Sequence, residues 1–154
     1  MRILMVICVL LSLFACSQKA PEFTEAQKDE LIKEIEAKMD ELIKSAEELN
    51  TEALWKYLAD GADKNFYMAG MALNKEELIS MTQAEYEGFA SQRMKIESRT
   101  TRMINPDAVL ALTLVSATAV DSLGDENMLN ITDSFLWEKI NGNWQVSHLH
   151  ESWE

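Results

Sequence analysis

Both histidines of the chain lie near its C-terminal end, within twenty residues of an aspartate. There, Asn141-Gly142 separates two alternating apolar runs, the strongest short signal for a β-hairpin with a two-residue type I′ turn. Counting outward from that turn predicts that Asp133 lies opposite His150 on the neighbouring strand. A carboxylate that orients an imidazole is suited to general acid–base chemistry, so Asp133 and His150 are the candidate catalytic residues.

The same counting predicts a mostly apolar sheet face around this pair, which we take as the concave face. A second turn near Gly124-Asp125 would place Ser116 beside Asp133, giving a polar row across three strands. Apolar walls with a few polar groups that fix orientation are typical of small-molecule sites. The predicted ligand-binding residues are Ser116, Phe135, Trp137 and His148, together with the aromatic Trp55 and Tyr67 from earlier segments.

Two other interpretations of these residues stay open. A buried aspartate and a histidine can pair only to satisfy each other's hydrogen bonds, without any ligand. His148, His150 and Asp133 also resemble a two-histidine, one-carboxylate metal site. Because two potential ligands two residues apart on a strand are common by chance, we predict neither a metal nor a cofactor.

The elements that must position these residues change from helical to extended along the chain. Thr24 and Gln27 have the spacing of a capping box, and a long amphipathic helix follows. A short helix over residues 53–59, a short strand over 66–70 and a helix over 75–86 come next. Alternating patterns then predict strands at 93–100, 108–121, 127–140 and 143–153. This order indicates an α+β domain in which about three N-terminal helices cover one face of a curved antiparallel sheet.

The element order and the motif Phe135-x-Trp-x-Lys-x-Asn-Gly-Asn-Trp-Gln-Val-x-His-x-His-x-Ser152 resemble the nuclear transport factor 2-like superfamily, in its SnoaL-like branch. The resemblance covers nearly all of residues 23–153 and implies a cone-shaped pocket between the helices and the concave sheet face. Isomerases of this superfamily pair a tyrosine with an acidic base. Tyr57 and Tyr67 lie in the corresponding region, but no acidic partner matches, so that mechanism is not transferred.

The resemblance also implies a way to self-associate, since sheets of this superfamily often dimerise through the convex face. The counting above assigns to that face an apolar row that is unsuited to solvent. Its members are Ala111, Thr113, Val115, Ala117 and Ala119. We therefore expect a homodimer formed through the convex face.

The N-terminal residues resemble a bacterial lipoprotein signal. Met1-Arg2 is a short basic start, residues 3–14 are apolar, and Cys16 follows directly. We expect residues 1–15 to be a signal peptide, Cys16 to be lipidated, residues 16–22 to be a tether and residues 23–154 to be the domain. The apolar run is too short for a transmembrane anchor, and a soluble secreted protein cut at an A-x-A-like site fits the sequence less well. Ser17 after the cysteine favours the outer membrane, with the domain facing the periplasm.

A net charge of −12 argues against nucleic acid, because phosphate backbones are bound by clustered Lys and Arg. The sequence thus predicts a lipid-anchored envelope domain that binds a small, partly apolar ligand. One alternative is an isomerase, lyase or hydrolase that uses Asp133 and His150. A non-catalytic interaction subunit is the other.

Overall fold

The computed structural model describes residues 23–61 and 66–154. The predicted signal peptide (residues 1–15) and the tether with Cys16 (residues 16–22) lie outside the described residues. Among the described residues, no helix is both long enough and apolar enough to span a membrane.

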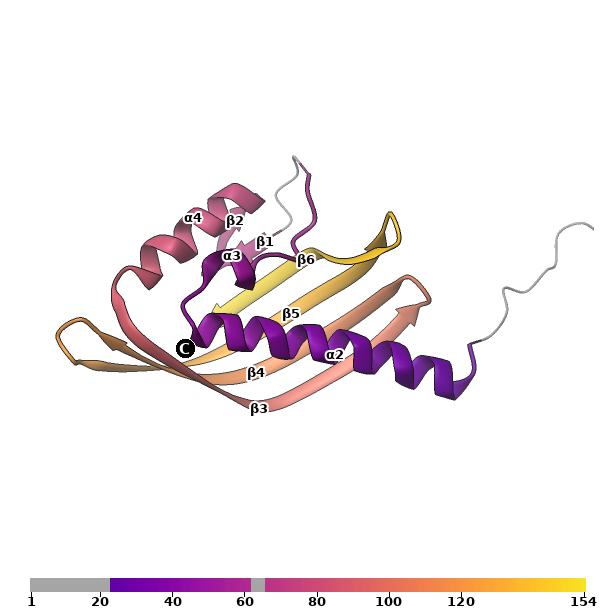
Figure 1. Ribbon diagram of the computed structural model, residues 1–154, viewed down its shortest axis with the longest axis horizontal. Helices are drawn as coiled ribbons and strands as arrows, with labels where there is room; N and C mark the ends of the chain where they lie inside the picture. The colour runs from indigo at the N-terminus through magenta and orange to yellow at the C-terminus, as the bar shows by residue number, and fades with distance from the viewer. Residues whose placement is uncertain (1–22, 62–65) are drawn as a thin grey trace, which may run out of the picture.

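The described residues form three helices and a six-stranded sheet (Figure 1). In chain order the elements are α2 (Glu25–Glu47), α3 (Thr51–Leu54), β1 (Phe66–Met68), β2 (Met71–Leu73), α4 (Lys75–Tyr86), β3 (Phe89–Asn105), β4 (Ala108–Asp121), β5 (Glu126–Ile140) and β6 (Asn143–Trp153). The strand order is β2-β1-β6-β5-β4-β3. Neighbouring strands run antiparallel except β1 and β6, which are parallel. The α+β prediction is confirmed, with a mixed sheet in place of the expected purely antiparallel one.

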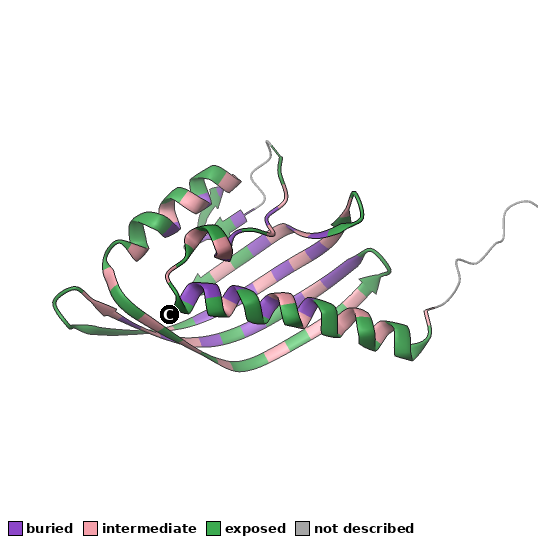
Figure 2. Ribbon diagram, in the orientation of Figure 1, coloured by how far each residue is buried: buried purple, intermediate pink, exposed green. Residues whose placement is uncertain are grey.

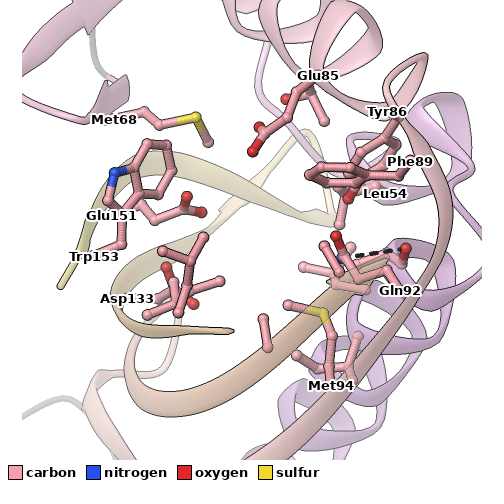
Figure 3. A pocket seen from close by; sticks show the side chains of 18 of the residues that line it. Leu54, Met68, Glu85, Tyr86, Phe89, Gln92, Met94, Asp133, Glu151 and Trp153 are labelled. Carbon is pink, nitrogen blue, oxygen red and sulfur yellow. Dashed lines mark hydrogen bonds between the residues drawn. The ribbon is translucent and has the colours of Figure 1, made fainter. Parts of the chain in front are cut away.

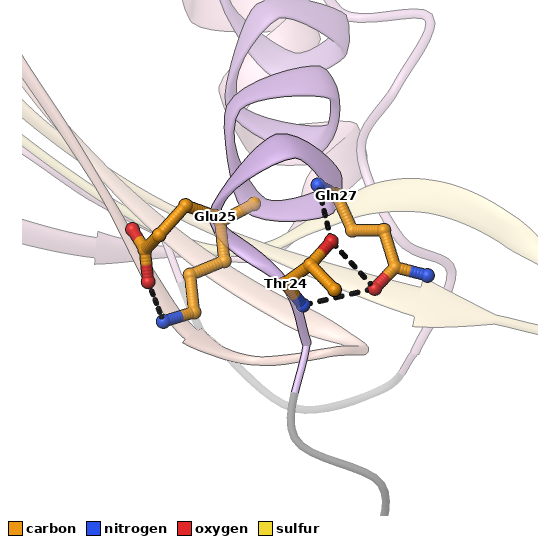
Figure 4. A network of polar contacts seen from close by, with 4 residues as sticks. Thr24, Glu25 and Gln27 are labelled. Atoms are coloured by element: carbon orange, nitrogen blue, oxygen red, sulfur yellow. Dashed lines mark hydrogen bonds and ion pairs between the residues drawn. The ribbon is translucent and has the colours of Figure 1, made fainter.

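Helix α2 begins as its sequence predicts. The Thr24 hydroxyl accepts the backbone N–H of Gln27, and the Gln27 side chain accepts the backbone N–H of Thr24, so both halves of the capping box form (Figure 4). The helix buries one stripe of side chains, formed by Ile35, Met39, Leu42, Ser45 and Ala46. That stripe packs with the concave sheet face into the main core, which also contains Ala111, Trp137 and Leu149.

The last hairpin has the predicted turn but not the predicted register. Asn141 and Gly142 both have positive φ, 52° and 82°, as a type I′ turn requires. Farther out, Trp137 pairs with Val146 whereas Leu136 pairs with His148, so Ser147 is an unpaired β-bulge residue. Because side chains alternate between faces, one extra residue moves every later side chain of β6 to the other face.

The β4–β5 connection also differs from the prediction. Residues 122–125 connect the two strands, with Gly124 at φ 89°, and the pairing is centred on Leu123 and not on a two-residue Gly124-Asp125 turn. The Asp121 carboxylate accepts hydrogen bonds from the backbone N–H groups of Leu123 and Asp125, and these bonds fix the conformation of the loop. The resulting register pairs Ser116 with Asn130 and Thr113 with Asp133.

The new register reverses the faces of β4. The row expected on the convex face (Ala111, Thr113, Val115, Ala117 and Ala119) is buried on the concave side instead. Buried and exposed bands alternate along the central strands in Figure 2. Leu112 and Leu114 take the convex positions and are 41% and 37% exposed.

Candidate functional site

A cavity of about 80 Å³ lies between the three helices and the concave sheet face (Figure 3). Its walls are mainly aliphatic, thioether and aromatic, with Met39 and Leu42 from α2, Trp55 after α3, and Phe89 and Met94 from β3. This volume is large enough for several water molecules. The cone-shaped pocket implied by the sequence is therefore present as an apolar cavity.

Trp55 holds one wall of the cavity in place. Its indole N–H donates to the Thr82 hydroxyl at 2.9 Å, and that hydroxyl donates to the Leu78 carbonyl one turn earlier in α4. The bond between Trp55 and Thr82 ties the segment after α3 to α4 through a buried contact. The prediction that Trp55 lines the cavity is consistent with this position.

Three carboxyl groups converge on the cavity, and among the described residues no other charged side chain lines it. Asp133 on β5 and Glu151 on β6 are directly paired in the sheet, and Glu85 reaches toward the cavity from the last turn of α4 (Figure 3). Asp133 is 6% exposed. Its Oδ2 accepts a long 3.4 Å hydrogen bond from the Thr113 hydroxyl, and its Oδ1 has no hydrogen-bond partner among the described residues.

Burial makes these acids unusually weak. It raises the pKa of Asp133 to about 7, although the hydrogen bond that Oδ2 accepts from Thr113 acts in the opposite direction. Burial also raises the pKa of Glu151 well above its usual range, and the nearby charges of Asp133 and Glu85 raise it further. The pKa of Glu85 is raised by burial of its carboxyl group, even though the rest of that residue is exposed. Near neutral pH the pair can therefore share a proton, and can donate it, accept one, or bind a positive group.

The predicted pairing of Asp133 with His150 is wrong. Beyond the Ser147 bulge, His150 pairs with Ser134 on the convex face, where it is exposed. His148 lies on the same convex face, and the Tyr67 ring is 5.7 Å from the His148 ring and 6.4 Å from the His150 ring. The predicted site therefore divides between two faces of the sheet.

The other predicted residues divide in the same way. Phe135 lines the cavity, as expected. Trp137 is fully buried in the core with its ring 5.3 Å from Tyr57, but it does not line the cavity. Ser116 is on the convex face, where its hydroxyl donates to Glu97 at 3.0 Å and contacts Asn130 at 3.2 Å.

Sequence reasoning missed Glu151 and Glu85. Glu151 takes the place expected of His150, and the sequence around Ser147 has no residue that signals the bulge. Glu85 could have been found, because it continues the packed stripe of Leu78 and Thr82 by one more turn of α4. In the part of the chain that the structure describes, no three His, Cys, Asp or Glu side chains are arranged to hold a metal ion.

No family model and no curated protein matches the sequence. Solved structures match it over most of its length. A nuclear transport factor 2-like superfamily protein from Salmonella enterica serovar Typhimurium has a TM-score of 0.69 at 19% identity, with 80% of this chain and 91% of that chain covered. The chain has the nuclear transport factor 2-like fold.

Other structures with the nuclear transport factor 2-like fold differ widely in their described roles. A putative scytalone dehydratase from Novosphingobium aromaticivorans has a TM-score of 0.70 at 12% identity, covering 80% of this chain and 84% of that one. The association domain of C. elegans CaMKII has a TM-score of 0.63 at 17% identity, covering 81% and 97%. At such low sequence identity the similarity shows a common fold only, so the function must be argued from the residues of the site.

The buried acid predicts how stability depends on pH. Asp133 binds its proton more tightly in the native protein than in the unfolded chain, so the free energy of unfolding should fall as pH rises from about 3.8 to about 7. Asp133→Asn should flatten this slope and raise the free energy of unfolding at pH 8 by about 1–4 kcal/mol, since one pKa unit corresponds to about 1.4 kcal/mol. Urea unfolding at several pH values measures this. Asp107→Asn, at the exposed β3–β4 turn, is the control, and an equal effect of both changes would contradict the prediction.

Proposed function

We propose that this domain binds a small, mostly apolar molecule whose polar group meets Asp133 and Glu151. The observation that carries the proposal is the unpartnered Oδ1 of Asp133 at the wall of an apolar cavity. A buried acceptor without a hydrogen bond costs about 1–3 kcal/mol. A ligand that supplies the missing donor would offset this cost, and the apolar walls would hold the remainder of the molecule.

An enzyme is the second candidate, with the paired carboxyls in place of the predicted aspartate–histidine pair. Asp133, whose pKa is about 7, suits proton transfer near neutral pH, as in isomerases and lyases. The putative dehydratases among proteins of this fold support the same class of reaction. Turnover of a bound compound that is lost in Asp133→Asn while binding persists would favour the enzyme over a binding protein.

Blocking the cavity should prevent an apolar probe from binding. We expect 4-fluorotoluene to bind the purified protein and to show a broadened fluorine NMR line. Ala117→Trp should abolish the broadening, because Ala117 is buried at the cavity wall, whereas Thr118→Trp on the opposite face should not. Circular dichroism checks folding, and Ala117→Leu is a milder second variant. Equal broadening by wild type and both Ala117 variants would refute the pocket proposal.

We propose that the domain is attached to a membrane through lipid on Cys16 and faces the periplasm from the outer membrane. The apolar run before Cys16 supports this proposal, and the acidic surface does not, because anionic membranes attract basic segments. The acyl chains would therefore be the only anchor that the sequence suggests.

Mass spectrometry of the protein isolated from a bacterial host tests the anchor. The expected chain begins at Cys16 and carries diacylglycerol, and it sediments with membranes. Cys16→Ser should release the protein into the soluble fraction, while Cys8→Ser, within the predicted signal, should leave the anchor intact. A mature chain that begins elsewhere would remove the membrane proposal.

We propose that two copies associate through the convex face. Its exposed Leu112 and Leu114 form an apolar strip on β4 and support the proposal, in place of the alanine-rich row predicted from the sequence. Similarity in fold to the CaMKII association domain agrees with self-association.

Placing a charge on this strip should separate the two copies. Leu114→Lys should raise the dimer dissociation constant at least about tenfold, because an unpaired ammonium would be buried in the interface. Leu123→Lys introduces the same charge in the β4–β5 loop, where Leu123 is 86% exposed, and should have no effect. Sedimentation equilibrium measures both, and a wild-type protein that is monomeric at all concentrations would end the dimer proposal.

A further inference from the structure

The described residues that line the cavity include acids but no base. Its three charged lining residues are Asp133, Glu151 and Glu85, and the lining includes no lysine, arginine or histidine. Buried carboxylates normally have a positive partner or several hydrogen bonds, because an isolated charge is costly to remove from water. Among the described residues, none of these three carboxyls forms an ion pair. The positive partner is therefore missing from the described part of the chain.

The positive side chain in the same row of the sheet is already engaged. Arg99 on β3 pairs with Thr113, which in turn pairs with Asp133. The Arg99 Nη1 forms an ion pair with Asp40 of α2 at 2.8 Å and donates to the Glu36 carbonyl, whereas the buried Nε and Nη2 have no hydrogen-bond partner among the described residues. Its charge is thus balanced at α2, and it does not line the cavity.

We propose that the natural ligand is a small organic cation, a protonated amine on an apolar or aromatic body, whose ammonium group binds between Asp133 and Glu151. The inference rests on the proposed function and names the chemical class of its ligand. An ammonium donates up to three hydrogen bonds, and the free Asp133 Oδ1 accepts one. Hydrogen bonds between charged partners are about twice as strong as neutral ones.

The walls suit the apolar part of such a ligand. Trp153 lies beside Glu151, and Tyr86 and Phe89 line the opposite side of the cavity (Figure 3). Such aromatic rings attract cations and pack against apolar groups. Met68 and Met94 add polarisable thioethers. A hydrated metal ion would gain little from this apolar lining, and an anionic ligand would be repelled by the carboxyls.

The proposal predicts a pH dependence of ligand affinity. The titratable groups that face Asp133 are Glu151 from β6 and, across the cavity, Glu85 and Tyr86 from α4. Burial raises the pKa values of all four groups. A cation favours the ionised carboxylates, so its affinity should rise as pH rises through about 7, where Asp133 loses its proton. Binding near that pH should release protons into the buffer.

Three probes of one shape and different charge test the inference with the purified full chain. Fluorine NMR titrations at pH 8 compare 4-fluorobenzylamine, 4-fluorobenzyl alcohol and 4-fluorobenzoate. We expect the amine to bind about 10- to 100-fold more tightly than the alcohol, the range given by a charged hydrogen bond. The benzoate should bind most weakly, and lowering the pH to 5 should remove most of the advantage of the amine.

A matched pair of variants separates the site from the overall negative charge. Asp133→Asn/Glu151→Gln should abolish the preference for the amine while the alcohol still binds. Asp107→Asn/Glu154→Gln removes the same number of charges from exposed positions and should leave the preference intact. Equal loss in both double variants would assign the preference to the net charge of the protein and overturn the inference.

The remaining outcomes distinguish this inference from the pocket itself. An alcohol that binds as tightly as the amine overturns the cation inference and leaves the pocket proposal standing. Binding of 4-fluorotoluene without binding of any of the three polar probes also overturns the cation inference and leaves the pocket proposal standing. If 4-fluorotoluene also fails to bind, both proposals fail. Displacement of the amine by Ca²⁺ or Zn²⁺ at lower concentration than the amine needs would make this a metal site and overturn the inference.

Discussion

The chemistry of the cavity depends on one unpaired residue, the bulge at Ser147 in β6. Before the bulge, Val146 points into the core opposite Trp137. After it, Leu149 and Glu151 take the concave positions, and His148 and His150 take the convex ones. A regular strand would have placed an imidazole beside Asp133. The bulge places a second carboxyl there, which changes a familiar acid–base pair into two acids that compete for a proton.

The helices cause the raised pKa values of Asp133 and Glu151, because they bury both carboxyls. Both carboxyls would be ordinary acids on an uncovered sheet. Helix α2 buries an aliphatic stripe over the concave face, and α4 closes the same end of the cone with Thr82 and Glu85. Removing water in this way weakens both acids and leaves the Asp133 Oδ1 without a donor. The buried Asp133 carboxyl thus lowers the stability of the fold. Natural proteins commonly keep such destabilising groups where function requires them.

The sequence predicted the features that depend on local chemistry. The capping box at Thr24, the type I′ turn at Asn141-Gly142 and the alternating strands all appear, because short-range hydrogen bonds and side-chain periodicity determine them. It did not predict which sheet face is concave. That depends on register, and two features changed it: a bulge with no sequence signal and a β4–β5 loop that begins earlier in the chain than expected. Each error was small along the chain, yet each reversed a strand's faces. Asp133 and Phe135 were placed correctly, whereas the two histidines and Ser116 were not.

The parallel pairing of β1 with β6 has a consequence for the order of folding. Residues 66–68 pair with residues 149–151, so the β1–β2 hairpin has no sheet to join until β6 has been synthesised. The same stretch of β6 contributes Glu151. The docking of β1 and the pairing of Asp133 with Glu151 therefore both wait for β6. A nascent chain that lacks β6 has an open sheet edge at β5 and has Asp133 without Glu151.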